Sequence, residues 1–134
     1  MTNRNNAGGQ DAPGTGRHLP PPSSLTSELA AEKRTLIRKR ERIYGLVNAI
    51  YDDSIILVAK TAPVFKAKYE RMQKLQSDFD LVQNEILFFN ERIPPGSTEA
   101  LKTDQEQKSF NSLVDAANFN YFKFLKADTP PPGA

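Results

Sequence analysis

Apolar side chains recur at helical spacing in three long stretches of this chain, and proline separates those stretches. The ten prolines fall at 13, 20–22, 63, 94, 95 and 130–132, so residues 23–62, 64–93 and 96–129 contain none. Proline removes a backbone donor and clashes with the preceding helical turn. The pattern therefore predicts three helices, which we place at about residues 27–60, 63–93 and 98–127.

The first stretch has two adjacent apolar rows, which together make one broad face on a helix. One row repeats every seven residues at Leu29, Leu36, Ile43, Ile50 and Leu57, and the second lies one position further on, at Ala30, Ile37, Tyr44, Tyr51 and Val58. Thr26 or Ser27 is expected to cap the N-terminus of this helix. Gly45 should cost about 1 kcal/mol relative to Ala. The Asp52-Asp53 pair is a candidate break.

The second stretch has the most regular pattern, an a/d heptad repeat that Lys68 interrupts. Its positions are Phe65, Met72, Phe79, Ile86 and Ile93, with Leu75, Val82 and Phe89 between them. Thr61 is expected to cap this helix, and Pro63 suits its first turn. The helix in the third stretch is expected to start near Thr98 or Thr103, and Thr103 and Glu106 have the spacing of a capping box. Its shared apolar face comprises Phe110, Leu113, Val114, Ala117, Tyr121, Phe124 and Leu125.

These patterns predict an all-α fold, an elongated antiparallel coiled-coil-like three-helix bundle over residues 25–128. Short connections around Pro63 and at Pro94-Pro95-Gly96 favour antiparallel neighbours. The tails at 1–24 and 129–134 have almost no large apolar side chain, so we predict that both are disordered. Strands are disfavoured because no stretch alternates with period two.

The composition removes most catalytic chemistry. The 134 residues include no Cys and a single His, His18, which argues against a disulfide, a thiolate metal site or a His-based triad. No P-loop, G-x-G-x-x-G or H-E-x-x-H motif occurs. The carboxylate pairs Asp52-Asp53 and Asp78/Asp80 are interpreted as solvated surface groups. We expect no enzymatic activity, cofactor, metal or small-molecule substrate.

The apolar segments are too short for a membrane span. The longest uninterrupted apolar run, Ile55 to Ala59, is far below the roughly 20 residues that a span requires. Residues 1–10 are polar where a signal peptide would need an apolar region. We expect a cytoplasmic or nuclear protein that is neither secreted nor transmembrane.

Residues 33–42 form the densest basic run, six positive charges with Glu41 the only internal acid, although the whole chain is only +2. Arg34, Arg38 and Arg42 share one side of the predicted helix, while two of the other cations fall in its apolar seam. The three arginines are candidate phosphate-binding residues, for RNA or an anionic membrane. An ordinary solvated helix surface is the alternative.

Four large apolar residues do not fit the core-facing rows. Leu81 and Phe88 lie on the far side of the second predicted helix, and Phe119 and Phe122 leave the main stripe of the third. We predict that they form a partner-binding surface, for another copy of this chain or another helical protein. In the alternative, the long first helix covers them and they belong to the core.

The order of these features resembles the N-terminal helical region of Gag-like polyproteins from BEL/Pao-type LTR retrotransposons. The resemblance spans about residues 33–125. It comprises a basic first helix (Lys33-Arg34, Arg38, Arg40, then Ile43, Gly45, Val47), a second helix with Phe79, Val82-Gln83 and Glu85-Ile86, and a third with Glu106, Phe110 and Asp115. It implies a structural, self-assembling role, with this chain as a fragment of a larger polyprotein or a domesticated piece of one. The chain has no zinc knuckle or protease motif.

Overall fold

The computed structural model describes residues 25–128, so the predictions for 1–24 and 129–134 lie outside the described residues. Four helices occur in this range: α1 (Ser27–Ile55), α2 (Ala62–Tyr69), α3 (Met72–Arg92) and α4 (Asp104–Asp128). The described part of the chain contains no strand. The predicted all-α class is therefore confirmed.

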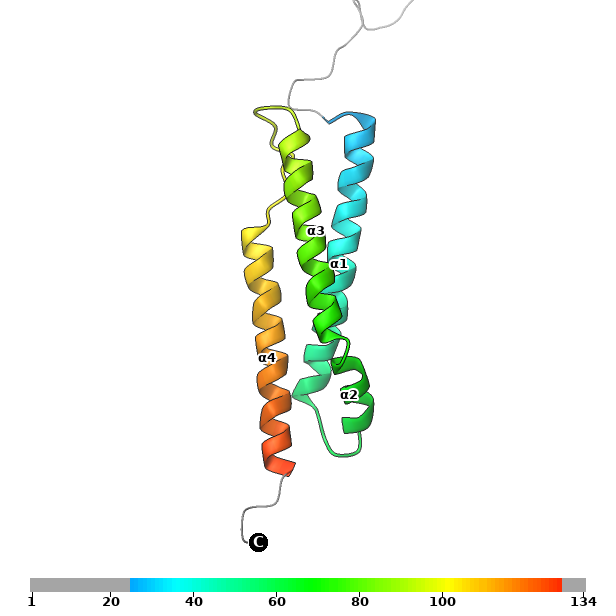
Figure 1. The fold of residues 1–134 in the computed structure, drawn as a ribbon, viewed down its shortest axis with the longest axis vertical. Coiled ribbons are helices and arrows are strands. Elements are labelled where there is room, and N and C mark those ends of the chain that lie inside the picture. Colours follow the sequence, from blue (N-terminus) through cyan, green and yellow to red (C-terminus); the bar gives the residue numbers. More distant parts are fainter. Residues whose placement is uncertain (1–24, 129–134) are drawn as a thin grey trace, which may run out of the picture.

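The three long helices lie side by side along the long axis of the molecule (Figure 1). α3 returns alongside α1, and α4 then runs in the same direction as α1. α1 contacts both α3 and α4, and it also contacts the short α2. α1 is thus the helix that joins the other elements.

α1 begins where the sequence predicts and ends earlier. The Thr26 Oγ1 atom accepts a hydrogen bond from the Leu29 backbone N–H at 3.2 Å, so the predicted cap is confirmed. The helix ends at Ile55 and not at 60, immediately after Ser54, whose hydroxyl donates to the Tyr51 carbonyl at 2.6 Å. Such a bond back to the preceding turn competes with helix continuation.

The single helix predicted over 63–93 is two helices, α2 and α3, separated at Glu70 and Arg71. Pro63 lies in the first turn of α2 as predicted, but the Thr61 side chain makes no capping bond to α2. Instead its hydroxyl bonds both the N–H and the carbonyl of Val58, at 3.2 and 3.1 Å, and closes the turn after α1. α2 and α3 are not collinear (Figure 1).

Residues 93–103, the α3–α4 connection, are irregular, so α4 begins next to Thr103, the later of its two predicted starts, and not near Thr98. Side chains of the neighbouring helices bind its backbone. The Asn90 amide bonds both the N–H and the carbonyl of Leu101, each at 2.9 Å. Arg40 donates to the Lys102 carbonyl at 2.6 Å, and Gln83 donates to the Thr103 carbonyl at 2.9 Å. These bonds replace those that a helix would make internally.

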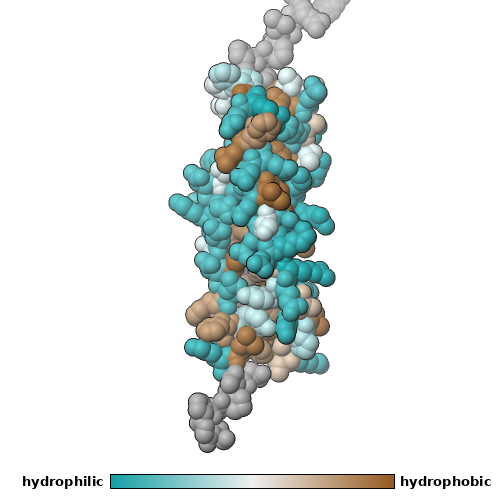
Figure 2. Space-filling model, viewed as in Figure 1, coloured by the Kyte–Doolittle hydropathy of each residue, from teal (hydrophilic) through white to brown (hydrophobic). Residues whose placement is uncertain are grey.

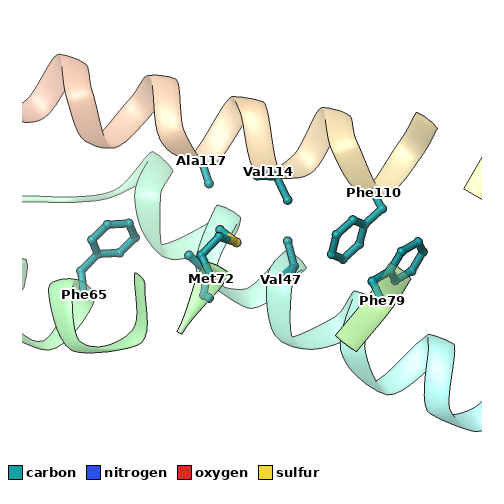
Figure 3. Packing of buried hydrophobic residues seen from close by; sticks show 8 residues of the cluster. Val47, Phe65, Met72, Phe79, Phe110, Val114 and Ala117 are labelled. Carbon is teal, nitrogen blue, oxygen red and sulfur yellow. The ribbon is translucent and has the colours of Figure 1, made fainter. Parts of the chain in front are cut away.

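The buried side chains form two clusters. The large cluster joins all four helices, and Figure 3 shows how seven of its side chains converge. Its members are Val47, Ile50, Phe65, Met72, Phe79, Phe110, Val114 and Ala117. The small cluster lies where the start of α1 meets the end of α3, and comprises Leu36, Val82, Ile86 and Phe89.

Most predicted core positions are buried or partly buried, but three positions differ. Val47, which belongs to neither predicted row, is fully buried. Val58 and Leu125, assigned to apolar faces, are 52% and 45% exposed. Val58 lies beyond the end of α1, and Leu125 lies in the last turns of α4.

Candidate functional site

Leu81 and Phe88 lie on the outside of α3, 62% and 60% exposed. They are two helical turns apart on the same side of the helix. α1 does not cover them, so the alternative that they belong to the core is wrong. The two side chains line the groove between α1 and α3, which we call the α1–α3 groove.

The α1–α3 groove has balanced charge. Its six charged lining residues are three acids and three bases: Glu32, Asp78, Glu85, Lys39, Arg42 and Arg92. Two ion pairs cross it, Lys39 to Glu85 at 3.1 Å and Arg92 to Glu32. The hydrogen bond and charge of Arg92 lower the pKa of the Glu32 carboxyl. Arg92 also lies over the Phe88 ring, 4.5 Å from its centroid.

Phe119 and Phe122 are exposed in the same degree, 62% and 59%, but they lie on a different surface. They line a groove at the end of α4 that shares no residue with the α1–α3 groove. Lys123 lies 5.3 Å from the Phe119 ring centroid, and Lys126 lies 5.0 Å from that of Phe122. The four predicted partner-binding residues therefore form two separate surfaces.

The basic run of α1 divides into two groups. Arg34, Arg38 and Arg42 are exposed, and among the described residues none of them makes an ion pair within 4.0 Å. The other three cations have structural partners. Lys33 pairs with Glu99 at 2.8 Å, Lys39 pairs with Glu85, and Arg40 bonds Gln83 and Lys102. The α3–α4 connection thus explains why two cations occupy the apolar seam.

Sequence reasoning missed a further group of exposed apolar residues where α1 ends. Ile55, Ile56, Val58 and Val64 are 58%, 72%, 52% and 63% exposed. The heptad pattern predicts a helix that continues to 60, so it gives no sign that α1 ends before these residues. The Asp52-Asp53 pair, noted as a candidate break, was the available signal that the helix ends near this point.

Each of the two carboxylate pairs noted in the sequence has one member in an ion pair with a lysine. Within 25–128 no group of three or more His, Cys, Asp or Glu side chains could hold a metal ion. Asp53 pairs with Lys68 at 3.0 Å, and Asp78 pairs with Lys74 at 3.1 Å, as expected for surface carboxylates. Burial raises the pKa of the Tyr69 hydroxyl, which donates to the side-chain carbonyl of Asn118.

Among the described helices, none has the length and apolar character needed to cross a membrane. Comparisons with protein-family models, curated proteins and solved structures found no match to this chain.

Proposed function

We propose that this protein is a non-enzymatic helical interaction module that self-associates through Leu81 and Phe88. The observation that carries the proposal is the exposure of these two side chains, 62% and 60%, on one side of α3. Exposed apolar side chains of this size, grouped in a groove, are typical of interaction sites. The balanced charge of the α1–α3 groove supports a second copy as the partner, because two identical neutral surfaces do not repel each other.

The expected association is weak. Burying a large apolar side chain stabilises by roughly 1.5–3 kcal/mol, and a two-fold dimer buries each residue on both copies. Lost translational and rotational freedom offsets much of this gain. We therefore expect a dissociation constant of about 1–100 μM.

We further propose that α1, α3 and α4 pack as an antiparallel coiled-coil-like bundle that acts in the cytoplasm or nucleus. The shared heptad spacing supports the packing mode, and the Cys-free composition supports the compartment. The Gag-like resemblance adds the proposal that the chain is a structural piece of a retroelement polyprotein. An assembly role would agree with self-association.

The test is the solution mass of the full chain as a function of concentration, from about 1 to 500 μM. Leu81→Ser and Phe88→Ser should each lower the dimer fraction while helical circular dichroism and the melting temperature are retained. Val64→Ser is the matched control, since Val64 is 63% exposed on α2. A wild-type chain that stays monomeric over this range overturns the proposal, as does a dimer that both α3 variants leave intact.

A second candidate function is binding of a phosphate-bearing partner, RNA or an anionic membrane, through Arg34, Arg38 and Arg42. The observation that favours it is their exposure at i, i+4 spacing without an ion pair among the described residues. Binding should weaken steeply with salt because condensed counterions are released.

Replacing the three arginines by Gln should abolish this binding. The matched control replaces the exposed cations Lys74, Lys102 and Lys108 by Gln, which changes the net charge equally. Equal losses in the two triple variants would indicate an effect of net charge alone and would remove the candidate.

A further inference from the structure

One end of the molecule collects most of its exposed large apolar side chains. Seven of the eleven lie there, and we call them the apolar tip: Ile55, Ile56, Val58, Val64, Phe119, Phe122 and Leu125. They come from the end of α1, the α1–α2 connection, α2 and the last turns of α4, which lie together in Figure 1. In Figure 2 apolar patches lie beside hydrophilic side chains at this end, and other apolar patches lie toward the opposite end.

Contacts of α4 with α1 and α2 join the two parts of the tip. Asn120 of α4 donates to the Ser54 hydroxyl of α1 at 3.0 Å, and a groove beside this bond is lined by Ile55 and Lys123. On the other side, the Tyr69 ring of α2 lies 4.7 Å from the Tyr121 ring of α4. Tyr69 also lines the groove of Phe119 and Phe122. The exposed residues therefore belong to one continuous end of the fold.

Lysines accompany the apolar side chains of the tip. Residues 54–69 and 116–127 contain no Asp or Glu, whereas they contain Lys60, Lys66, Lys68, Lys123 and Lys126. Lys60 and Lys66 are exposed and make no ion pair among the described residues.

The acids near the tip lie at the margins of these segments: Asp52, Asp53, Glu70, Asp115 and Asp128. Asp53 is already paired with Lys68. Asp115 lines the groove of Phe119 and Phe122, but the two segments that form the tip carry lysines and no acid, so they are basic as well as apolar.

We propose that the apolar tip binds the surface of an anionic lipid bilayer. Its apolar side chains would enter the boundary between headgroups and acyl chains, to a depth of roughly 5–10 Å. Lys123 and Lys126, whose ammonium groups lie over exposed rings, can extend to lipid phosphates while their stems stay among apolar groups. Each lysine near an anionic surface strengthens binding by roughly fivefold.

Two other occupants fit less well. In a symmetric contact with a second copy, the lysines of both tips would face one another, whereas the α1–α3 groove has balanced charge. A nucleic acid would stack its bases on aromatic faces. The most exposed tip residues, Ile56 and Val64, are aliphatic and match hydrocarbon. This proposal uses residues outside the α1–α3 groove, so it stands independently of the proposed dimer.

The experiment measures flotation of the full chain with phosphatidylcholine vesicles that contain either no phosphatidylserine or about 30%. Wild-type protein should bind only the anionic vesicles. The double variant Ile56→Ser/Val64→Ser should bind at least tenfold more weakly, because two apolar side chains no longer enter the bilayer. Lys60→Gln/Lys66→Gln should also weaken binding, with a smaller dependence on salt.

Two control variants locate the binding site. Leu46→Ser removes an exposed apolar side chain that lies outside both the tip and the α1–α3 groove, and it should bind like the wild type. If the vesicles bind the tip and not the second candidate site on α1, replacing Arg34, Arg38 and Arg42 by Gln should retain most of the binding. If instead the arginine variant abolishes binding and the tip variants do not, the membrane site is the α1 face, and this proposal is overturned. The absence of binding to anionic vesicles at low salt also overturns it.

A depth measurement keeps the proposal testable even if a serine variant fails to fold. The chain has no Trp, so Ile56→Trp supplies a single fluorescent reporter. Its emission should shift to the blue on anionic vesicles, and lipids with brominated acyl chains should quench it. Leu46→Trp serves as the reporter outside both the tip and the α1–α3 groove, and it should remain unquenched. A quenched Leu46→Trp with an unquenched Ile56→Trp would contradict the inference.

Discussion

Gly45 is a residue whose replacement should stabilise the protein. It lies in the interior of α1, and a Cβ atom built there meets nothing within 4 Å. Glycine in a helix interior lowers the free energy of unfolding by roughly 0.5–1 kcal/mol relative to Ala, because a glycine residue loses more backbone freedom on folding than an alanine does. Gly45→Ala should therefore raise the free energy of unfolding by that amount and raise the melting temperature by roughly 2–8 °C.

Thermal melting followed by circular dichroism measures this effect. The matched comparison is Gly96→Ala, because Gly96 has a φ of +80°, a backbone conformation that disfavours side chains. That variant should be destabilised by about 1 kcal/mol despite the open space around it. A Gly45→Ala variant that melts below the wild type would be the contrary result.

At the residue scale, the sequence pattern predicts part of the core but not all of it. Phe79 and Phe110 could be assigned to the core from their spacing, and their rings stack with centroids 3.8 Å apart. Val47 belongs to neither row, yet at 100° per residue it lies between Ile43 and Tyr44 on the helix surface, inside the broad apolar face that the two rows make. Leu125 has the right spacing and yet is 45% exposed, since it lies near the end of α4. Periodicity predicts direction, whereas burial also requires a neighbouring element.

At the scale of elements, polar side chains fix the α3–α4 connection. The Asn90 amide makes two hydrogen bonds to Leu101, each 2.9 Å long. Asn90→Ala removes both and leaves two partly buried backbone groups without these partners. We expect a loss of about 1–3 kcal/mol in the free energy of unfolding, measured by urea denaturation.

Hydrogen exchange locates the effect of Asn90→Ala. Amides in residues 97–103 should exchange faster in the variant, while amides in the middle of α4 change less. Asn84→Ala is the control on the same helix, because Asn84 is exposed and should cost less than about 0.5 kcal/mol. An equal effect of the two substitutions would show that the connection does not depend on the Asn90 amide.

The ion pair between Glu32 and Arg92 joins α1 to α3 and gives stability a pH dependence. Arg92 lowers the pKa of Glu32 in the folded protein. The contribution of this ion pair to the free energy of unfolding is therefore present above the pKa of Glu32 in the unfolded chain, near 4.5. It is lost as the pH falls through the lower pKa of Glu32 in the folded protein. Since both side chains are about one-third exposed, at 36% and 35%, the effect is small.

Glu32→Gln should accordingly melt slightly below the wild type at neutral pH. The difference should shrink as the pH falls below 4.5, where the wild-type carboxyl is itself protonated. Added salt should shrink it too, because the pair is exposed. A difference between the two proteins that is constant from neutral to acidic pH would contradict this assignment.

The elements themselves were only partly predictable. Proline at 63, 94 and 95 marks interruptions that the structure retains. The separation of α2 from α3 has no such mark, since Glu70 and Arg71 are good helix formers. Tertiary contacts accompany it: the Phe65 ring lies 5.0 Å from the Tyr121 ring of α4, and Tyr69 bonds Asn118. The sequence offered both Thr98 and Thr103 as the start of α4, and the later start coincides with hydrogen bonds from Arg40 and Gln83 to the connection, whose partners the sequence alone could not identify.

At the scale of the whole molecule, the two ends are built differently. The large cluster includes side chains from all four helices. The small cluster has only α1 and α3, with Leu101 and Ile93 packed against it. Ile43 contacts both clusters and connects them. Four of the five ion pairs among the described residues hold α1 against its neighbours, and three of these four lie towards the end of the small cluster.

This division predicts that the end of the molecule around the small cluster opens before the rest unfolds. Stability within a fold varies with local packing, and the least supported unit opens at the lowest free energy. Amides in residues 30–40 and 86–92 should therefore exchange faster than those around Val47 and Val114.

Ile86→Val and Ile50→Val are mild, matched probes, each costing about 0.5–1.5 kcal/mol. Ile86→Val should speed exchange around the small cluster by roughly 2–12-fold, whereas Ile50→Val should leave those amides unchanged. If Ile50→Val speeds exchange equally at both ends, the molecule unfolds as one cooperative unit and the division of its core has no consequence for its dynamics.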